Sequence, residues 1–188
     1  IGDLKMLRHM GYRDLLSTLI LPVTLTSGRS YYDFFTWATT EEVKRYAEFN
    51  LQLHPLIGIP PAGIINPKVL DEAVAYIEEF ILAKKIVGIG EIGMGAGSKE
   101  EYITMKNQMA LAQKYNLPVV IQAPKVDKVA LTSIILKELK KANIDRAIVN
   151  HCDVETLQLV VRAHDVRIKA GITVGQQATD PGDAIRMF

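Results

Sequence analysis

The sequence lacks several features, and each absence narrows the class of protein. A single cysteine, Cys152, excludes an internal disulfide and suits a reducing compartment. No apolar run reaches the ~18 to 20 residues of a membrane span, and no signal-peptide pattern opens the chain. Charge of one sign is not in excess, since 22 Lys and Arg face 21 Asp and Glu. We therefore expect a soluble, cytoplasmic protein that was not built mainly to grip nucleic-acid backbone, although a local basic patch is compatible with this balance.

The chain does contain a regular alternation of strand and helix patterns. Its 188 residues are 48% apolar, enough for one sizeable core, so we expect a single domain over residues 1–188. Strand onsets recur about 30 residues apart, as in a barrel of eight βα units. Six strands fit either a doubly wound open sheet or a barrel without its first and last strands. The six predicted strands cover residues 15–24, 51–59, 85–90, 118–122, 145–151 and 166–174.

The sequence also predicts several helix starts. Asn66 is expected to cap one helix, and a capping box at residues 98–101 is expected to start another. The aromatic segment 31–37 is expected to precede a further helix that Thr40 caps, and its rings are expected to serve core and lid packing rather than base stacking.

The most informative stretch is residues 85–93, an apolar run that ends in glycines around a single carboxylate, Glu91. A continuous Ile/Val/Gly run without alternation predicts a strand buried on both faces, here residues 85–90. Glu91 is then expected at its carboxyl end, where α/β proteins bind ligands. The letters GxGxxG also occur here, but the first two glycines fall inside the predicted strand, so a dinucleotide fingerprint is not favoured.

Polar residues follow several of the other predicted strands and would meet at one edge of a parallel sheet. A Glu and a His from separate strands can share a divalent metal such as zinc. His151 could equally be a structural histidine, and Asp153 is expected to cap the following helix. The residues at or just past the strand ends are Thr24, Pro60, Glu91, Gln122, His151 and the turn at 175–177.

Four segments together resemble the TatD-like metal-dependent hydrolases of the amidohydrolase superfamily, most closely the branch of predicted TIM-barrel hydrolases. They are residues 90–93 (GEIG), 108–112 (QMALA), 117–121 (LPVVI) and 150–153 (NHCD). The resemblance covers residues 15 to 175. It implies a (β/α) barrel with a metal centre at its carboxyl-terminal mouth, where a metal-bound hydroxide hydrolyses phosphodiester, amide or similar bonds.

Carried over by position, the resemblance assigns Glu91 as a carboxylate ligand and His151 as a histidine ligand. Gln122 falls where the family has a further ligand histidine, and a neutral amide is a poor zinc ligand, so a complete two-metal site is in question. The family's opening His-x-His strand and its late aspartate have no counterpart and are expected outside the given residues. The expected fold class is therefore α/β, a TIM-type barrel lacking its first and last strands.

The resulting hypothesis is a hydrolase with one or two divalent ions, zinc being the expected metal, held by Glu91 and His151. Gln122 and Gln176 are expected to contact a small-molecule or phosphodiester substrate, nucleic acid being a partner only as a substrate. The catalytic base is unassigned, and so is the oligomeric state. The alternative is a catalytically silent barrel that binds a ligand or a partner at the same mouth, which Gln122 favours. A lyase or isomerase barrel is less favoured, because no predicted strand ends in a lysine.

Overall fold

The protein is described by a computed structural model that covers residues 2–19, 23–63, 66–144, 146–163, 167–174 and 180–187. Helices and strands alternate along this part of the chain, as the sequence pattern predicts. Among the described residues, no helix combines the length and the apolar character that crossing a membrane requires. The helices are α1 (Gly2–His9), α2 (Gly28–Thr39), α3 (Glu41–Ala47), η1 (Pro61–Gly63), α4 (Pro67–Leu82), α5 (Lys99–Lys114), α6 (Lys128–Lys141), α7 (Val154–Arg162) and α8 (Pro181–Arg186). The strands are β1 (Asp14–Thr18), β2 (Gln52–Ile57), β3 (Gly88–Gly93), β4 (Val119–Gln122), β5 (Ala147–Asn150) and β6 (Ile168–Ala170).

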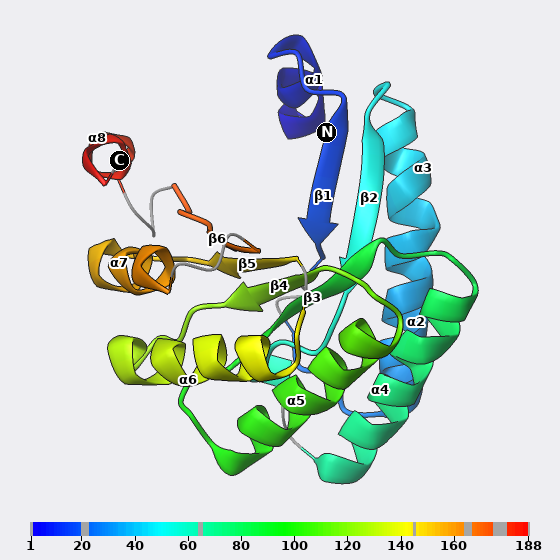
Figure 1. Ribbon diagram of the computed structural model, residues 1–188. Helices are drawn as coiled ribbons and strands as arrows, with labels where there is room; N and C mark the ends of the chain where they lie inside the picture. The colour runs from blue at the N-terminus through cyan, green and yellow to red at the C-terminus, as the bar shows by residue number, and fades with distance from the viewer. Residues whose placement is uncertain are drawn as a thin grey trace.

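The six strands form one parallel sheet in the sequential order β1-β2-β3-β4-β5-β6. A doubly wound sheet would reverse its strand order at a switch point, so that alternative is excluded. Figure 1 shows the strand direction turning steadily from β1 and β2 to β5 and β6, while α2 to α6 cover the outer side. The sheet is thus curled into a half-barrel, and the expected barrel class is confirmed.

The core lies between the convex face of the sheet and the helices that cover it. Ile89, Ile121 and Val149, on three neighbouring strands, are fully buried and belong to one cluster with residues of α4, α5 and α6. Their strand neighbours alternate toward the concave side, where Leu16 of β1 is 64% exposed. Strand alternation therefore sends one set of side chains into the helices and the other into the barrel interior.

In the amino-terminal half, one predicted helix boundary and one predicted capping contact differ from the structure. The aromatic segment 31–37, expected to precede a helix, lies inside α2, because Ser27 caps that helix and accepts a hydrogen bond from the Ser30 amide at 3.1 Å. Thr40 stands at the start of α3 as expected, but its hydroxyl donates to the Thr36 carbonyl and makes no capping hydrogen bond. The core role expected for the aromatics is confirmed for Tyr31 and Phe35, which are both buried.

The strand around Glu91 is also displaced from its predicted position. It runs over Gly88–Gly93, so Glu91 lies inside β3 rather than beyond its end. Lys84 adopts a left-handed conformation (φ 55°) after α4, and residues 85–87 connect that helix to the strand. Helix caps are the better predicted boundaries, since Asn66 caps α4 and the Ser98–Glu101 capping box starts α5.

A buried glutamine holds the chain where β2 ends. The Gln108 side chain of α5 is fully buried, and its Oε1 accepts a hydrogen bond from the Ile59 amide at 2.7 Å. Its Nε2 donates to the Ile59 carbonyl at 3.2 Å and to the Thr104 carbonyl at 3.3 Å. Gln108 therefore replaces a missing strand partner for the segment that follows β2 at the carboxyl edge of the sheet.

Replacing Gln108 with leucine should lower the free energy of unfolding by about 3 kcal/mol, because the buried amide and carbonyl of Ile59 would both lose their partner. Urea denaturation measures this change. Gln113→Leu, at an exposed position of the same helix, is the matched control and should leave stability nearly unchanged. Equal effects of the two substitutions would show that the Ile59 contacts contribute nothing.

Candidate functional site

The site is built around a carboxylate that the fold buries. Every residue of β3 is buried, and Glu91 is only 3% exposed. Its Oε1 lies 3.1 Å from Nε2 of His151 and accepts a hydrogen bond from Nδ2 of Asn150 at 3.4 Å. A buried charge is tolerated only when such partners compensate its lost hydration. The structure therefore brings together Glu91 and His151, the two predicted metal ligands.

The backbone of β3 is irregular where it carries Glu91. The pairing with β4 shifts between Ile89 and Ile92, and the Gly90–Glu91 peptide bond is cis. A side chain at Gly90 would place its Cβ 2.9 Å from Cβ of Val120 and 3.0 Å from the Val120 carbonyl oxygen. The glycine is thus required for close contact between the two strands beside the site.

His151 stands directly after β5 in a left-handed conformation (φ 59°) and its side chain is 43% exposed. Its two ring nitrogens contact different partners: Nε2 faces Glu91, and Nδ1 lies 2.6 Å from Oγ1 of Thr173. The hydrogen bond to Glu91 raises the pKa of His151 above its usual value, against the opposing effects of burial and of the Lys125 and Lys128 charges. An imidazolium at this position therefore neutralises the buried carboxylate.

A proton and a metal ion would compete for the position between His151 Nε2 and Glu91 Oε1. When Nε2 of His151 is protonated, its proton lies between the imidazole and the Glu91 carboxylate, and a metal held by both groups would have to displace it. When the Thr173 hydroxyl accepts from Nδ1, it fixes the ring orientation and leaves Nε2 as the ligand atom, as oxygen partners of metal-bound histidines do.

The described residues supply only part of a metal site. They contain no group of three His, Cys, Asp or Glu side chains that could hold one ion. A catalytic zinc site takes three protein ligands, and Glu91 with His151 provides two of the expected types. The Asn150 carboxamide turns its Nδ2 toward Glu91, so it orients that carboxylate rather than adding a third ligand. The donor set thus fits a divalent cation as two strong ligands of a larger set.

Gln122 lies where the prediction placed it, at the end of β4. The strand register aligns it with Gly93 of β3 and with Asn150 of β5, so it stands at the same sheet edge as the Glu91–His151 pair. The side chain is half-buried. Its expected contact with a substrate stays a prediction, and Gln176 lies outside the described residues.

Two neighbours of His151 have structural roles. Asp153 caps α7 as expected, with its carboxylate accepting from the Thr156 amide at 3.0 Å and from Lys128 Nζ at 2.8 Å. Burial opposes its ionisation, but the hydrogen bonds from Lys128 and Thr156 together outweigh burial and lower the pKa of Asp153 to about 2. Cys152 is buried, and burial raises the pKa of its thiol, which agrees with a packing residue rather than a nucleophile.

Sequence reasoning missed Thr173 as a partner of His151. The last strand was predicted to reach residue 174, but β6 ends at Ala170, so the strand-end position falls nearer to Thr173 than to the turn at 175–177. Gly171 continues the contact between strands, since its amide donates to Val149 and its carbonyl accepts from Cys152. Gly171, which directly follows the alternating pattern of Ile168, Lys169 and Ala170, was the available sign of this boundary.

The pKa of His151 should fall below its ordinary value in Glu91→Gln, because the carboxylate that raises it is lost while burial and the two lysines still lower it. Titration of the imidazole ring protons by NMR in metal-free protein measures the change. In the parent protein the raised pKa adds stability that is complete below the unfolded-state value of about 6.5 and is lost as the pH rises through the folded-state value. An unchanged pKa in the variant would contradict the pairing.

Comparison with known proteins agrees with this architecture. An uncharacterized metal-dependent hydrolase of Methanocaldococcus jannaschii is 28% identical over 174 residues, which are 92% of this chain and 67% of that protein. The crystal structure of a TatD-like protein from Archaeoglobus fulgidus matches with a TM-score of 0.78 at 24% identity, over 98% of this chain and 84% of the other. A TatD homolog from Escherichia coli matches with a TM-score of 0.60 at 17% identity, over 91% and 60% of the two chains. These two structures show a shared fold, and the model of the family described as TatD related DNase matches residues 16–185. The chain belongs to the TatD related DNase family.

Proposed function

We propose that this protein is a metal-dependent hydrolase that holds a divalent cation between Glu91 and His151, and that this cation is zinc. The observation that carries the proposal is the 3.1 Å contact between Oε1 of a buried carboxylate and Nε2 of an imidazole. Imidazole and carboxylate are ligands that suit zinc and related ions. Membership of the TatD related DNase family and the name of the Methanocaldococcus jannaschii relative support the same function.

Two neighbouring side chains orient the proposed metal ligands. Asn150 donates to the Glu91 carboxylate and orients it, and Thr173 holds the His151 ring by its other nitrogen. Loss of the shared proton on His151 frees Nε2 for coordination. A bound divalent cation supplies a water of lowered pKa as the nucleophile.

The charges around the mouth favour a phosphodiester over an amide as substrate. Lys125 and Lys128 lie close enough to His151 to lower its pKa. Lys128 is held by Asp153 at 2.8 Å, whereas Lys125 is exposed and has no carboxylate partner among the described residues. Its backbone amide donates to the Gly95 carbonyl at 3.2 Å, which fixes the loop after β4. We infer that Lys125 receives a negatively charged group of the substrate, from a nucleic acid or from a small phosphodiester.

Glu91→Gln should remove the bound metal and lower kcat/KM for hydrolysis of bis(p-nitrophenyl) phosphate by more than about 100-fold. Loss of an outer partner alone typically reduces metal affinity or activity by about 10 to 100-fold, and Glu91 is placed as a direct ligand. Elemental analysis, the hydrolysis rate and a melting curve are measured together. Glu100→Gln, at an exposed position of α5, is the charge-matched control. A large loss of stability with unchanged metal content would instead assign Glu91 to a structural ion pair.

A silent binding barrel is the second candidate, and the neutral carboxamide of Gln122 is the observation that favours it. Gln122→His should raise metal occupancy, because the strand register places residue 122 beside Gly93 and Asn150 at the edge that carries Glu91. Metal stoichiometry is measured against Gln113→His, an exposed control. Unchanged occupancy in a folded Gln122→His protein, combined with no hydrolysis by the parent, would support the silent barrel.

A further inference from the structure

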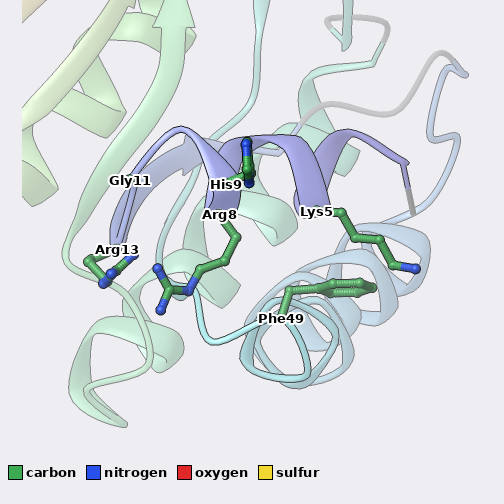
Figure 2. A pocket seen from close by; sticks show the side chains of 6 residues that line it. All are labelled: Lys5, Arg8, His9, Gly11, Arg13 and Phe49. Carbon is green, nitrogen blue, oxygen red and sulfur yellow. The ribbon is translucent and has the colours of Figure 1, made fainter.

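A second candidate site lies at the opposite edge of the sheet. A hollow of about 510 Å³ opens where α1 ends and β1 and β2 begin (Figure 2). It is formed by three segments that are distant in the sequence: the last turns of α1, the connection to β1, and the end of α3. Its lining residues are Lys5, Arg8, His9, Gly11, Arg13 and Phe49. The Glu91–His151 pair lies toward the carboxyl ends of β3 and β5, whereas the hollow lies at the amino ends of β1 and β2. The two sites are therefore at opposite edges of the parallel sheet.

The hollow is strongly cationic although the chain as a whole carries a formal charge of only +1. Three of its six lining residues carry full positive charges, a fourth is a histidine, and none is acidic. Among the described residues, no salt bridge to Lys5, Arg8 or Arg13 is formed. On β1, the Asp14 carboxylate lies 2.9 Å from Nε2 of His54 instead of pairing with a cation of the hollow. Positive potential is therefore not cancelled within the hollow.

An aromatic ring completes the hollow. Phe49 follows α3 and is half-buried, and Figure 2 shows its ring in the same hollow as the Arg8 and Lys5 side chains that extend from α1. The segment is fixed, because the Phe49 amide donates to Tyr46 and the Gln52 amide donates to the Arg13 carbonyl at 2.7 Å. Cations beside an aromatic face are the combination that binds single-stranded nucleic acid without base readout.

We propose that this hollow binds the phosphates of a single-stranded polynucleotide, with Arg8, Arg13 and Lys5 contacting the backbone and Phe49 stacking on a base. The volume exceeds what one phosphate group requires, and the cations are spread along α1 and its connection to β1, which matches successive phosphates of a strand. The proposal does not depend on the proposed hydrolysis, because no residue of the hollow belongs to the Glu91–His151 site.

A purely structural role would give these cations a different task. The carbonyls at the end of α1 are partly negative, and basic residues in the last turn of a helix compensate them. Arg13 also donates to the Tyr12 carbonyl at 3.1 Å. If compensation were their whole function, neutralising Arg8 and Arg13 would lower the melting temperature and leave polynucleotide binding unchanged.

The test compares two double variants that remove the same charge, Arg8→Gln/Arg13→Gln and Lys137→Gln/Lys140→Gln, the second pair being exposed on α6. Binding of a fluorescently labelled single-stranded 12-mer is followed by anisotropy at several salt concentrations, with the strand checked for integrity afterwards. We expect the hollow pair to weaken binding about tenfold and to reduce the salt slope by about 1.4, since each phosphate contact on a single strand contributes about 0.7. The α6 pair should change affinity less than twofold.

Two further measurements keep the outcome decisive. Phe49→Leu should weaken binding at least about fivefold through lost stacking, and Lys5→Glu, at an exposed position of α1, should do the same if the Arg double variant does not fold. Inorganic phosphate and a mononucleotide should compete only at far higher concentration than the 12-mer. Equal effects of the hollow and α6 pairs, or full binding by Lys5→Glu and Phe49→Leu, would overturn the proposal.

Discussion

The structure depends on one costly placement, a carboxylate inside an otherwise apolar strand. Glu91 lies within β3, where all six residues are buried, and it takes its compensation from the next strand but one. A buried carboxylate without partners would shift its pKa or unfold its surroundings, so the positions of Asn150 and His151 are tied to that of Glu91. The left-handed conformation of His151 turns its ring back toward β3. The distance between β3 and β5 is therefore constrained by the contacts of Glu91 with Asn150 and His151 as well as by side-chain packing.

Much of this fold could be predicted from local sequence patterns. Apolar periodicity placed six strands and their connecting helices, and capping residues such as Asn66 and Ser98 located helix starts well. Strand ends were predicted less well, because they depend on pairing with neighbours. β3 begins at Gly88 after a connection that is itself apolar, and β6 ends at Ala170 although its pattern continues. No local pattern contains the register shift between Ile89 and Ile92.

The site was predicted where a residue type and a strand end coincide, and missed where the contact is made through folding alone. Glu91 and His151 were predicted as metal ligands from their place beside strands and from the family resemblance, and the structure brings the two side chains together. Thr173 reaches His151 from a segment after β6, and nothing in its own sequence neighbourhood suggests a histidine partner. The basic hollow is a stronger case, since Lys5, Arg13 and Phe49 come from separate segments that share no period. The formal net charge of +1 for the whole chain gives no sign of such a local cluster.

The charge of Glu91 constrains what the mouth can bind. An ionised carboxylate would repel a phosphodiester. The positive charges of Lys125 and Lys128 reduce this repulsion only in part, because Lys128 already forms a salt bridge with Asp153. The remaining compensation comes from His151, whose raised pKa keeps it protonated over a wider pH range in the absence of another cation. A divalent cation at the same position would supply twice that charge and free the imidazole of its proton. Compensation of Glu91 is thus a condition for the proposed binding of an anionic substrate as well as for the proposed hydrolysis, and both requirements rest on Glu91 and His151.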